Sequence, residues 1–179
     1  MTLNLRPLTK TVLLILVLSG CCIATVNAND PRQPEHIVFT PTFYRGLNLN
    51  GAALSIDGNS WVASSGAPNF SYTGNTFANQ NVTLNPATDA NRATMIRSSI
   101  WGNLTLNLTS VTSGYYDIYL YVWEGNTPAT FTISIEGTVA QSNYNSGSAG
   151  TWAKLGPFRR NITDGAINIA TTGGGANLS

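Results

Sequence analysis

The clearest evidence for the fold lies in the run Tyr115-Tyr116-Asp117-Ile118-Tyr119-Leu120-Tyr121-Val122-Trp123. Its side chains alternate with the period of two that is typical of a β-strand. One face carries Ile118, Leu120 and Val122, and the opposite face carries two tyrosines and Trp123. Because both faces are apolar or amphipathic, we expect a central strand that is covered on both sides.

The same period of two recurs on both sides of this stretch. Residues 104–109, 131–136 and 167–169 alternate apolar with polar side chains, and glycines separate the runs where a turn needs a permissive backbone. No segment shows a helical stripe. Short strands at about 10-residue spacing predict an all-β, antiparallel two-sheet sandwich. The final residues, 173–179, are loop-like, so we expect the sandwich to lack its last strand, as in a fragment of a longer protein.

The N-terminal residues predict export. Arg6 and Lys10 precede the apolar run 12–18, which is too short to span a membrane, and residues 1–28 therefore resemble a signal segment. Two processing sites compete. Residues 18–21 match a bacterial lipobox that would acylate Cys21, and the triplet ending at Ala28 fits ordinary cleavage. Residues 29–36, which contain two prolines, are predicted to be a linker.

Charge and cysteine content limit the function classes. The sequence has nine Lys and Arg against eight Asp and Glu, and loss of Arg6 and Lys10 on export leaves seven against eight, a net charge of −1. So few charges give no basic patch for nucleic acid. Both cysteines, Cys21 and Cys22, belong to the leader, so the folded part has no disulfide and depends on its core.

From Phe43 onward the order of sequence landmarks resembles the malectin-like carbohydrate-binding domains, especially those of bacterial secreted and surface proteins. The resemblance assigns residues 37–179 to one such domain. It implies a jelly-roll-type sandwich whose loops at one end hold a sugar, with one further strand after Leu178. The matching pieces are Phe43–Gly51, Arg97–Gly102, Gly114–Leu120, Phe131–Gly137 and Thr163–Gly165.

The resemblance carries over only part of the family's binding site. Trp101 stands where a tyrosine of the animal member stacks on the sugar. The aromatic pair of that member is missing, because only residues 125–128 follow the strand that ends at Glu124. A late ligand-binding aspartate maps to glycines 173–175 and has no counterpart. The glucose-oligosaccharide specificity of the animal member therefore does not transfer to this chain.

The residues themselves predict sugar contacts in loops, since a pyranose is bound by flat aromatic rings and fixed polar groups. Trp101 is the first candidate, with a buried core tryptophan as the alternative. Tyr72 and Tyr144 lie in polar stretches, and each could instead cap the edge of the core. Glu124 and Asn126 could bind vicinal hydroxyls or could form a turn-stabilising pair.

Catalysis and metal binding have little support in the sequence. The only histidine, His36, lies in the linker, so a Ser-His-Asp or Cys-His arrangement has no base. We expect no enzyme, although five acids leave glycoside hydrolysis formally open: Asp57, Asp89, Asp117, Glu124 and Asp164. We expect no cofactor. Asp57-Gly58-Asn59 could hold a structural calcium ion but is typical of a hairpin turn.

These observations predict a non-catalytic module that binds an oligo- or polysaccharide outside the cell. With Cys21 lipidated, the module would sit at the outer surface or in the periplasm, and its only membrane contact would be the lipid anchor. Without lipidation it would be extracellular, and other modules of a surface complex are further expected partners. The rival interpretation is a structural or adhesive sandwich that contacts proteins, since a fold does not determine its function.

Overall fold

The computed structural model describes residues 24–25, 38–39, 41–78 and 81–179. Cys21, the two processing sites, His36 and the linker 29–36 lie outside the described residues. Two short strands, β1 (Ala24–Thr25) and β2 (Val38–Phe39), pair antiparallel with each other. None of the helical structure in the described part of the chain is long and apolar enough to cross a membrane.

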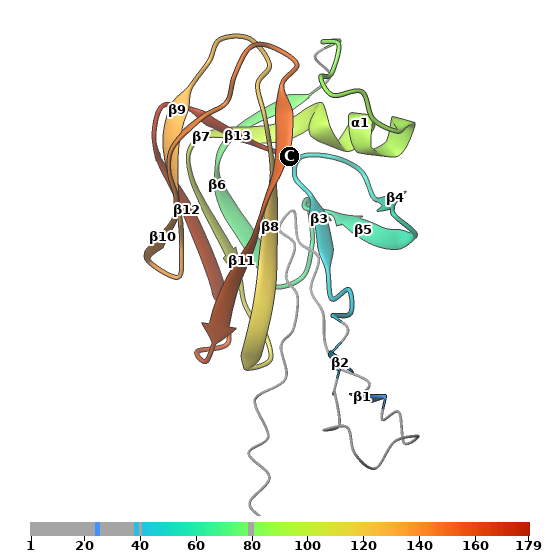
Figure 1. Ribbon diagram of the computed structural model, residues 1–179, viewed down its shortest axis with the longest axis vertical. Coiled ribbons are helices and arrows are strands. Elements are labelled where there is room, and N and C mark those ends of the chain that lie inside the picture. The colour runs from blue at the N-terminus through green and yellow to red at the C-terminus, as the bar shows by residue number, and fades with distance from the viewer. Residues whose placement is uncertain (1–23, 26–37, 40, 79–80) are drawn as a thin grey trace, which may run out of the picture.

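The remaining described residues form an all-β fold with one short helix, α1 (Figure 1). The predicted strands 104–109, 115–123, 131–136 and 167–169 coincide with β7, β8, β9 and β12 except at residues 109 and 136, which follow β7 and β9, and this confirms the all-β prediction. The elements are β3 (Gly46–Asn48), β4 (Leu54–Ile56), β5 (Asn59–Ala63), β6 (Phe70–Ala78), α1 (Ala90–Ile96), β7 (Ser98–Leu108), β8 (Gly114–Trp123), β9 (Thr130–Ile135), β10 (Thr138–Asn145), β11 (Trp152–Ile162), β12 (Ile167–Gly173) and β13 (Ala176–Leu178).

Most strands belong to one hydrogen-bonded sheet that forms a sandwich or barrel-like arrangement. Its order is β10-β9-β12-β7-β13-β8-β11, and β6 adds to β7. A separate three-stranded sheet, β3-β5-β4, contains the parallel pair β3 and β5. In Figure 1 the small sheet and α1 lie to one side of β8, and β9, β10 and β12 lie to the other.

The prediction that residues 173–179 are loop-like without a strand is wrong for residues 176–178. These form β13, which is inserted between β7 and β8. Ala176 and Leu178 are fully buried and pair with Gly102 and Ile100, so they satisfy backbone groups of β7 and also fill the core. Two apolar residues were too short a pattern to mark a strand in the sequence.

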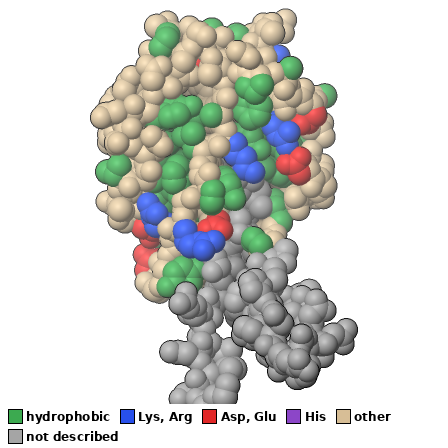
Figure 2. All heavy atoms as spheres, in the orientation of Figure 1, with side chains coloured by type: hydrophobic (Ala, Val, Ile, Leu, Met, Phe, Trp, Pro, Cys, Tyr) green, Lys and Arg blue, Asp and Glu red, His purple; other side chains and the backbone are tan. Residues whose placement is uncertain are grey.

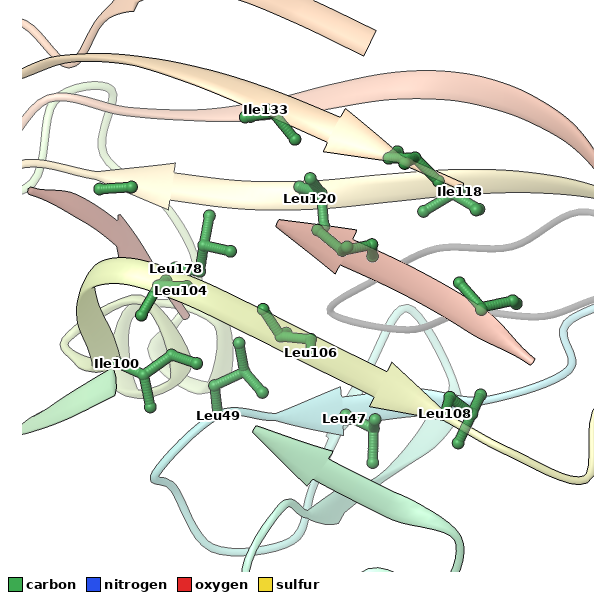
Figure 3. Packing of buried hydrophobic residues seen from close by; sticks show 14 of the residues in the cluster. Leu47, Leu49, Ile100, Leu104, Leu106, Leu108, Ile118, Leu120, Ile133 and Leu178 are labelled. Carbon is green, nitrogen blue, oxygen red and sulfur yellow. The ribbon is translucent and has the colours of Figure 1, made fainter. Parts of the chain in front are cut away.

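Strand β8 is buried on both faces, as its alternation predicted. Ile118, Leu120 and Val122 belong to the main core, which the inward side chains of β7, β8, β9, β12 and β13 share (Figure 3). Tyr121 and Trp123 belong to a second core, formed with Trp61, Met95 and other residues of β4, β5 and α1. The small sheet and the helix thus cover the face of β8 that is turned away from the main core.

Helix α1 begins after the N-cap Asp89, whose carboxylate accepts a 2.9 Å hydrogen bond from the backbone N–H of Arg92. The Arg92 guanidinium pairs with Asp89 and, at 2.6 Å, with Asp57. Asp57 and Gly58, both at positive φ, form the two-residue turn between β4 and β5, which is the predicted hairpin. The Asp57 carboxylate therefore binds an arginine that joins this hairpin to α1.

Charged side chains are few, and several of them lie beside a side chain of opposite charge. On the face that Figure 2 shows, Lys and Arg side chains lie next to Asp and Glu side chains, and uncharged atoms cover the rest. Within the part of the chain that the structure describes, Arg92 pairs with Asp57 and Asp89, and Arg159 pairs with Asp117. The surface therefore consists largely of hydroxyl, amide and apolar groups.

Candidate functional site

A pocket of about 280 Å³ opens where β6, β7, β13 and the loop between β8 and β9 meet. We call it the Trp101 pocket. It gathers Trp101, Glu124 and Asn126, three of the five predicted site residues, although they stand up to 25 positions apart in the sequence (126 − 101). Its lining residues are Phe77, Trp101, Glu124, Gly125, Asn126, Thr127, Ala129, Gly175 and Asn177.

Trp101 points outward from β7 and is 42% exposed. Its chain neighbour Ile100 is fully buried in the main core, so the alternation of the strand turns the indole ring to the opposite side. A Cβ atom on Gly175 would lie 3.5 Å from the indole atom Cε3, so this glycine borders the ring without covering it. The alternative of a buried core tryptophan is therefore wrong, and a flat aromatic ring is left accessible in the pocket.

Glu124 directly follows β8 and is 2% exposed. One carboxylate oxygen accepts a 2.9 Å hydrogen bond from the backbone N–H of Asn126, and the other accepts a 2.6 Å bond from the Ser146 hydroxyl. The Ser146 oxygen in turn accepts a bond from the backbone N–H of Ala129. Glu124 therefore holds the loop between β8 and β9 in place, as the turn-stabilising alternative proposed, and it also lines the pocket.

Two amide side chains supply the pocket with free hydrogen-bonding groups. Asn126 is exposed; its Oδ1 accepts a bond from the backbone N–H of Thr127, and its Nδ2 has no partner among the described residues. Asn177 is half-buried on β13 directly opposite Trp101, and its side chain has no hydrogen bond within the described part of the chain. An amide can both donate and accept, which suits the hydroxyl groups of a ligand.

The structure does not bring Tyr72 and Tyr144 into this pocket. Tyr72 is half-buried on β6, with its ring 5.9 Å from that of Phe70, and packs against the main core. Tyr144 is half-buried on β10, with its ring 5.5 Å from that of Phe131, and burial raises the pKa of its hydroxyl. Both rings lie at the edge of the core, which is the alternative that the sequence left open.

Sequence reasoning missed Phe77, Gly175 and Asn177 as pocket residues. Phe77 stands on β6, where its ring lies 6.5 Å from that of Trp123, so it connects the floor of the pocket to the second core. Gly175 and Asn177 belong to the segment that was expected to be a loop. The sequence does contain a short loop at 125–128 and a glycine run at 173–175. Neither feature indicates that the two segments meet in the fold.

The other acidic side chains have partners elsewhere. Asp57 and Asp89 pair with Arg92, Asp117 pairs with Arg159, and Glu136 and Asp164 each accept a bond from a backbone N–H. Within the described ranges, no three His, Cys, Asp or Glu side chains lie close enough together to hold a metal ion.

No protein-family model and no curated protein sequence matches this chain. Solved structures do match its fold. The ANXUR2 extracellular domain from Arabidopsis thaliana is 14% identical, with a TM-score of 0.56 over 96% of this chain and 52% of its own. The ANXUR1 extracellular domain from the same plant is 15% identical, with a TM-score of 0.55 over 74% of this chain and 45% of its own.

A third match is Bacteroides uniformis β-glucuronidase 2, covalently bound to cyclophellitol-6-carboxylate aziridine. It is 15% identical, with a TM-score of 0.54 over 91% of this chain and 22% of its own. This chain thus spans about half or less of the length of these structures. At such low identity the matches establish the fold alone. They agree with the fold that the sequence resemblance implies, because malectin-like ectodomains of plant receptor kinases are among the structural neighbours.

Proposed function

We propose that this domain binds carbohydrate without catalysis, outside the cell, and that the Trp101 pocket is its binding site. One observation carries the proposal: an exposed indole ring borders a pocket that also holds two amide side chains with free groups. The ring would stack on the C–H face of a pyranose. Asn126 and Asn177 would bind the hydroxyls at the rim of that sugar.

The absence of catalysis is supported by the state of the carboxylates. Both oxygens of Glu124, the acid in the pocket, are already bonded to Asn126 and Ser146. Asp117, which lies on the central strand β8, is paired with Arg159. Hydrolysis would need two carboxylates across one bond, and the described residues that line the pocket include one.

The test is titration with a panel of neutral and acidic polysaccharides. Tryptophan fluorescence and affinity electrophoresis measure the binding. We expect micromolar to millimolar binding that shifts the emission, and we expect Trp101→Ala to abolish both signals. The matched control is Tyr44→Ala, which removes an aromatic ring that is 38% exposed and lies outside the pocket. Circular dichroism confirms that both variants fold. Binding that survives Trp101→Ala would place the site elsewhere.

The rival proposal, a sandwich that contacts proteins, has one observation in its favour. A chain from the crystal structure of the plant peptide RALF23 in complex with FER and LLG2 matches this chain with a TM-score of 0.51 at 15% identity. A similar fold therefore occurs in a peptide–protein assembly. If no glycan of the panel binds the domain, this second function becomes the better explanation of the pocket.

A further inference from the structure

Among the described residues, those that line the Trp101 pocket contribute a negative charge and no positive one. Glu124 is the only ionisable residue of this described lining. The residue is 2% exposed, and its carboxylate is bonded to two uncharged donors, the backbone N–H of Asn126 and the hydroxyl of Ser146. Such donors orient a carboxylate but do not neutralise its charge.

The cationic side chains of the described residues have contacts away from the pocket. Arg92 and Arg159 are paired with aspartates. Arg45, Arg97 and Arg160 donate to backbone carbonyl groups, and the ammonium group of Lys154 lies 4.4 Å from the ring centre of Tyr119. None of the six lines the pocket.

A ligand carboxylate in this pocket would therefore face Glu124 without a counter-charge. Two like charges repel strongly where water is partly excluded, because the effective dielectric constant is below that of bulk water. A neutral sugar meets no such cost, since its hydroxyls can pair with Asn126, Asn177 and the hydroxyl of Thr127.

We propose, on the basis of the carbohydrate-binding function above, that the pocket selects neutral sugars and rejects uronic acids and other anionic sugars. Glu124 is then a specificity residue: its buried charge sets the preference, and the amides of Asn126 and Asn177 bind the hydroxyls of the accepted sugar. The selection depends on the charge of the ligand at the pocket and is independent of the stereochemistry of the sugar.

The test compares matched glycans that differ in charge: glucose with glucuronate, galactose with galacturonate, and methyl-esterified with free tri-galacturonate. Within any pair that binds, we expect the neutral sugar to bind about tenfold more tightly than the acidic one. The discrimination should widen at low ionic strength, because salt screens the repulsion. Isothermal titration calorimetry at two salt concentrations gives both results.

The variant Thr127→Lys adds a cation at an exposed position of the pocket rim, and we expect it to bring the affinity for the acidic member up to or above that for the neutral one. The control Val139→Lys adds the same charge at a side chain that is 57% exposed and lies outside the pocket, and it should leave the preference unchanged. Equal or tighter binding of the acidic member by the unmodified domain would overturn the selectivity while leaving carbohydrate binding intact. Failure of every glycan to bind would overturn both.

Discussion

The hydroxyl of Ser146 donates a 2.6 Å hydrogen bond to the carboxylate of Glu124, and both side chains are 2% exposed. This contact fixes the loop that forms one wall of the Trp101 pocket to the end of β10. We predict that Ser146→Ala lowers the free energy of unfolding by about 1–3 kcal/mol, because it leaves a buried charged acceptor without its partner. Urea unfolding measures the loss. The exposed Ser148→Ala should change stability by less than about 0.5 kcal/mol.

Gly175 controls access to the indole ring of Trp101. Its φ lies outside the left-handed region and its added Cβ meets the ring at 3.5 Å, an ordinary contact distance, so a side chain is compatible with the backbone there. We predict that Gly175→Leu folds normally but weakens glycan binding at least about tenfold, because the new side chain covers the stacking surface. Calorimetric titration measures the affinity. Unchanged binding would argue against stacking on this ring.

The neighbouring glycine provides the contrast. A Cβ on Gly174 would lie 2.9 Å from the carbonyl oxygen of Thr130, which belongs to the backbone and cannot move aside easily. Gly174→Ala should therefore lower the melting temperature, whereas Gly175→Ala should leave it nearly unchanged. Equal melting temperatures for the two alanine variants would show that the backbone yields at position 174.

Tyr116 should make the domain sensitive to high pH. Burial raises the pKa of its hydroxyl to about 12, above the value of about 10 in the unfolded chain. Between these two values the unfolded state loses the proton and the folded state keeps it, so rising pH favours unfolding. We predict a loss of about 2–3 kcal/mol between pH 10 and pH 12, measured by urea unfolding at several pH values. In Tyr116→Phe the slope over this range should be smaller, and an unchanged slope would assign it to other tyrosines.

Asp89 should stabilise α1 through its capping hydrogen bond. The bond from the backbone N–H of Arg92 is the main cause of the lowered pKa of the Asp89 carboxyl. We predict that Asp89→Ala costs about 1 kcal/mol of unfolding free energy and that Asp89→Asn, which retains a capping oxygen, costs less. Chemical unfolding of the three proteins tests this order. An equal cost for both variants would assign the effect to the lost ion pair with Arg92.

Side-chain alternation was sufficient to predict the all-β class and the double burial of β8. Each face of that strand could be judged from the residues themselves, with Leu120 on one and Tyr121 on the other. Helix α1 escaped prediction because only Met95 and Ile96 are buried in its 7 residues, which is too few for a stripe. Strand β13 escaped for a similar reason, since its pairing with β7 is decided by tertiary contact.

The position of a candidate side chain could be predicted where its neighbours in sequence determine its direction. Ile100 faces the core, so Trp101 must face outward, and Glu124 and Asn126 share one loop with few conformations. Tyr72 and Tyr144 also sit among polar residues, but their rings turn toward the core edge. The direction of these two rings depends on which strands flank β6 and β10, and the order of strands in the sheet could not be derived from this single sequence.

The position of β13 between β7 and β8 has a consequence for how the pocket responds to unfolding. Phe77 and Asn177 line the same pocket although they stand 100 positions apart (177 − 77), so no short fragment of the chain contains the site. Any ligand that fills it bridges the start and the end of the sandwich and binds only when both are in place. By mass action, occupancy then raises the melting temperature of the whole domain, and a simple thermal shift reports ligand binding without any label.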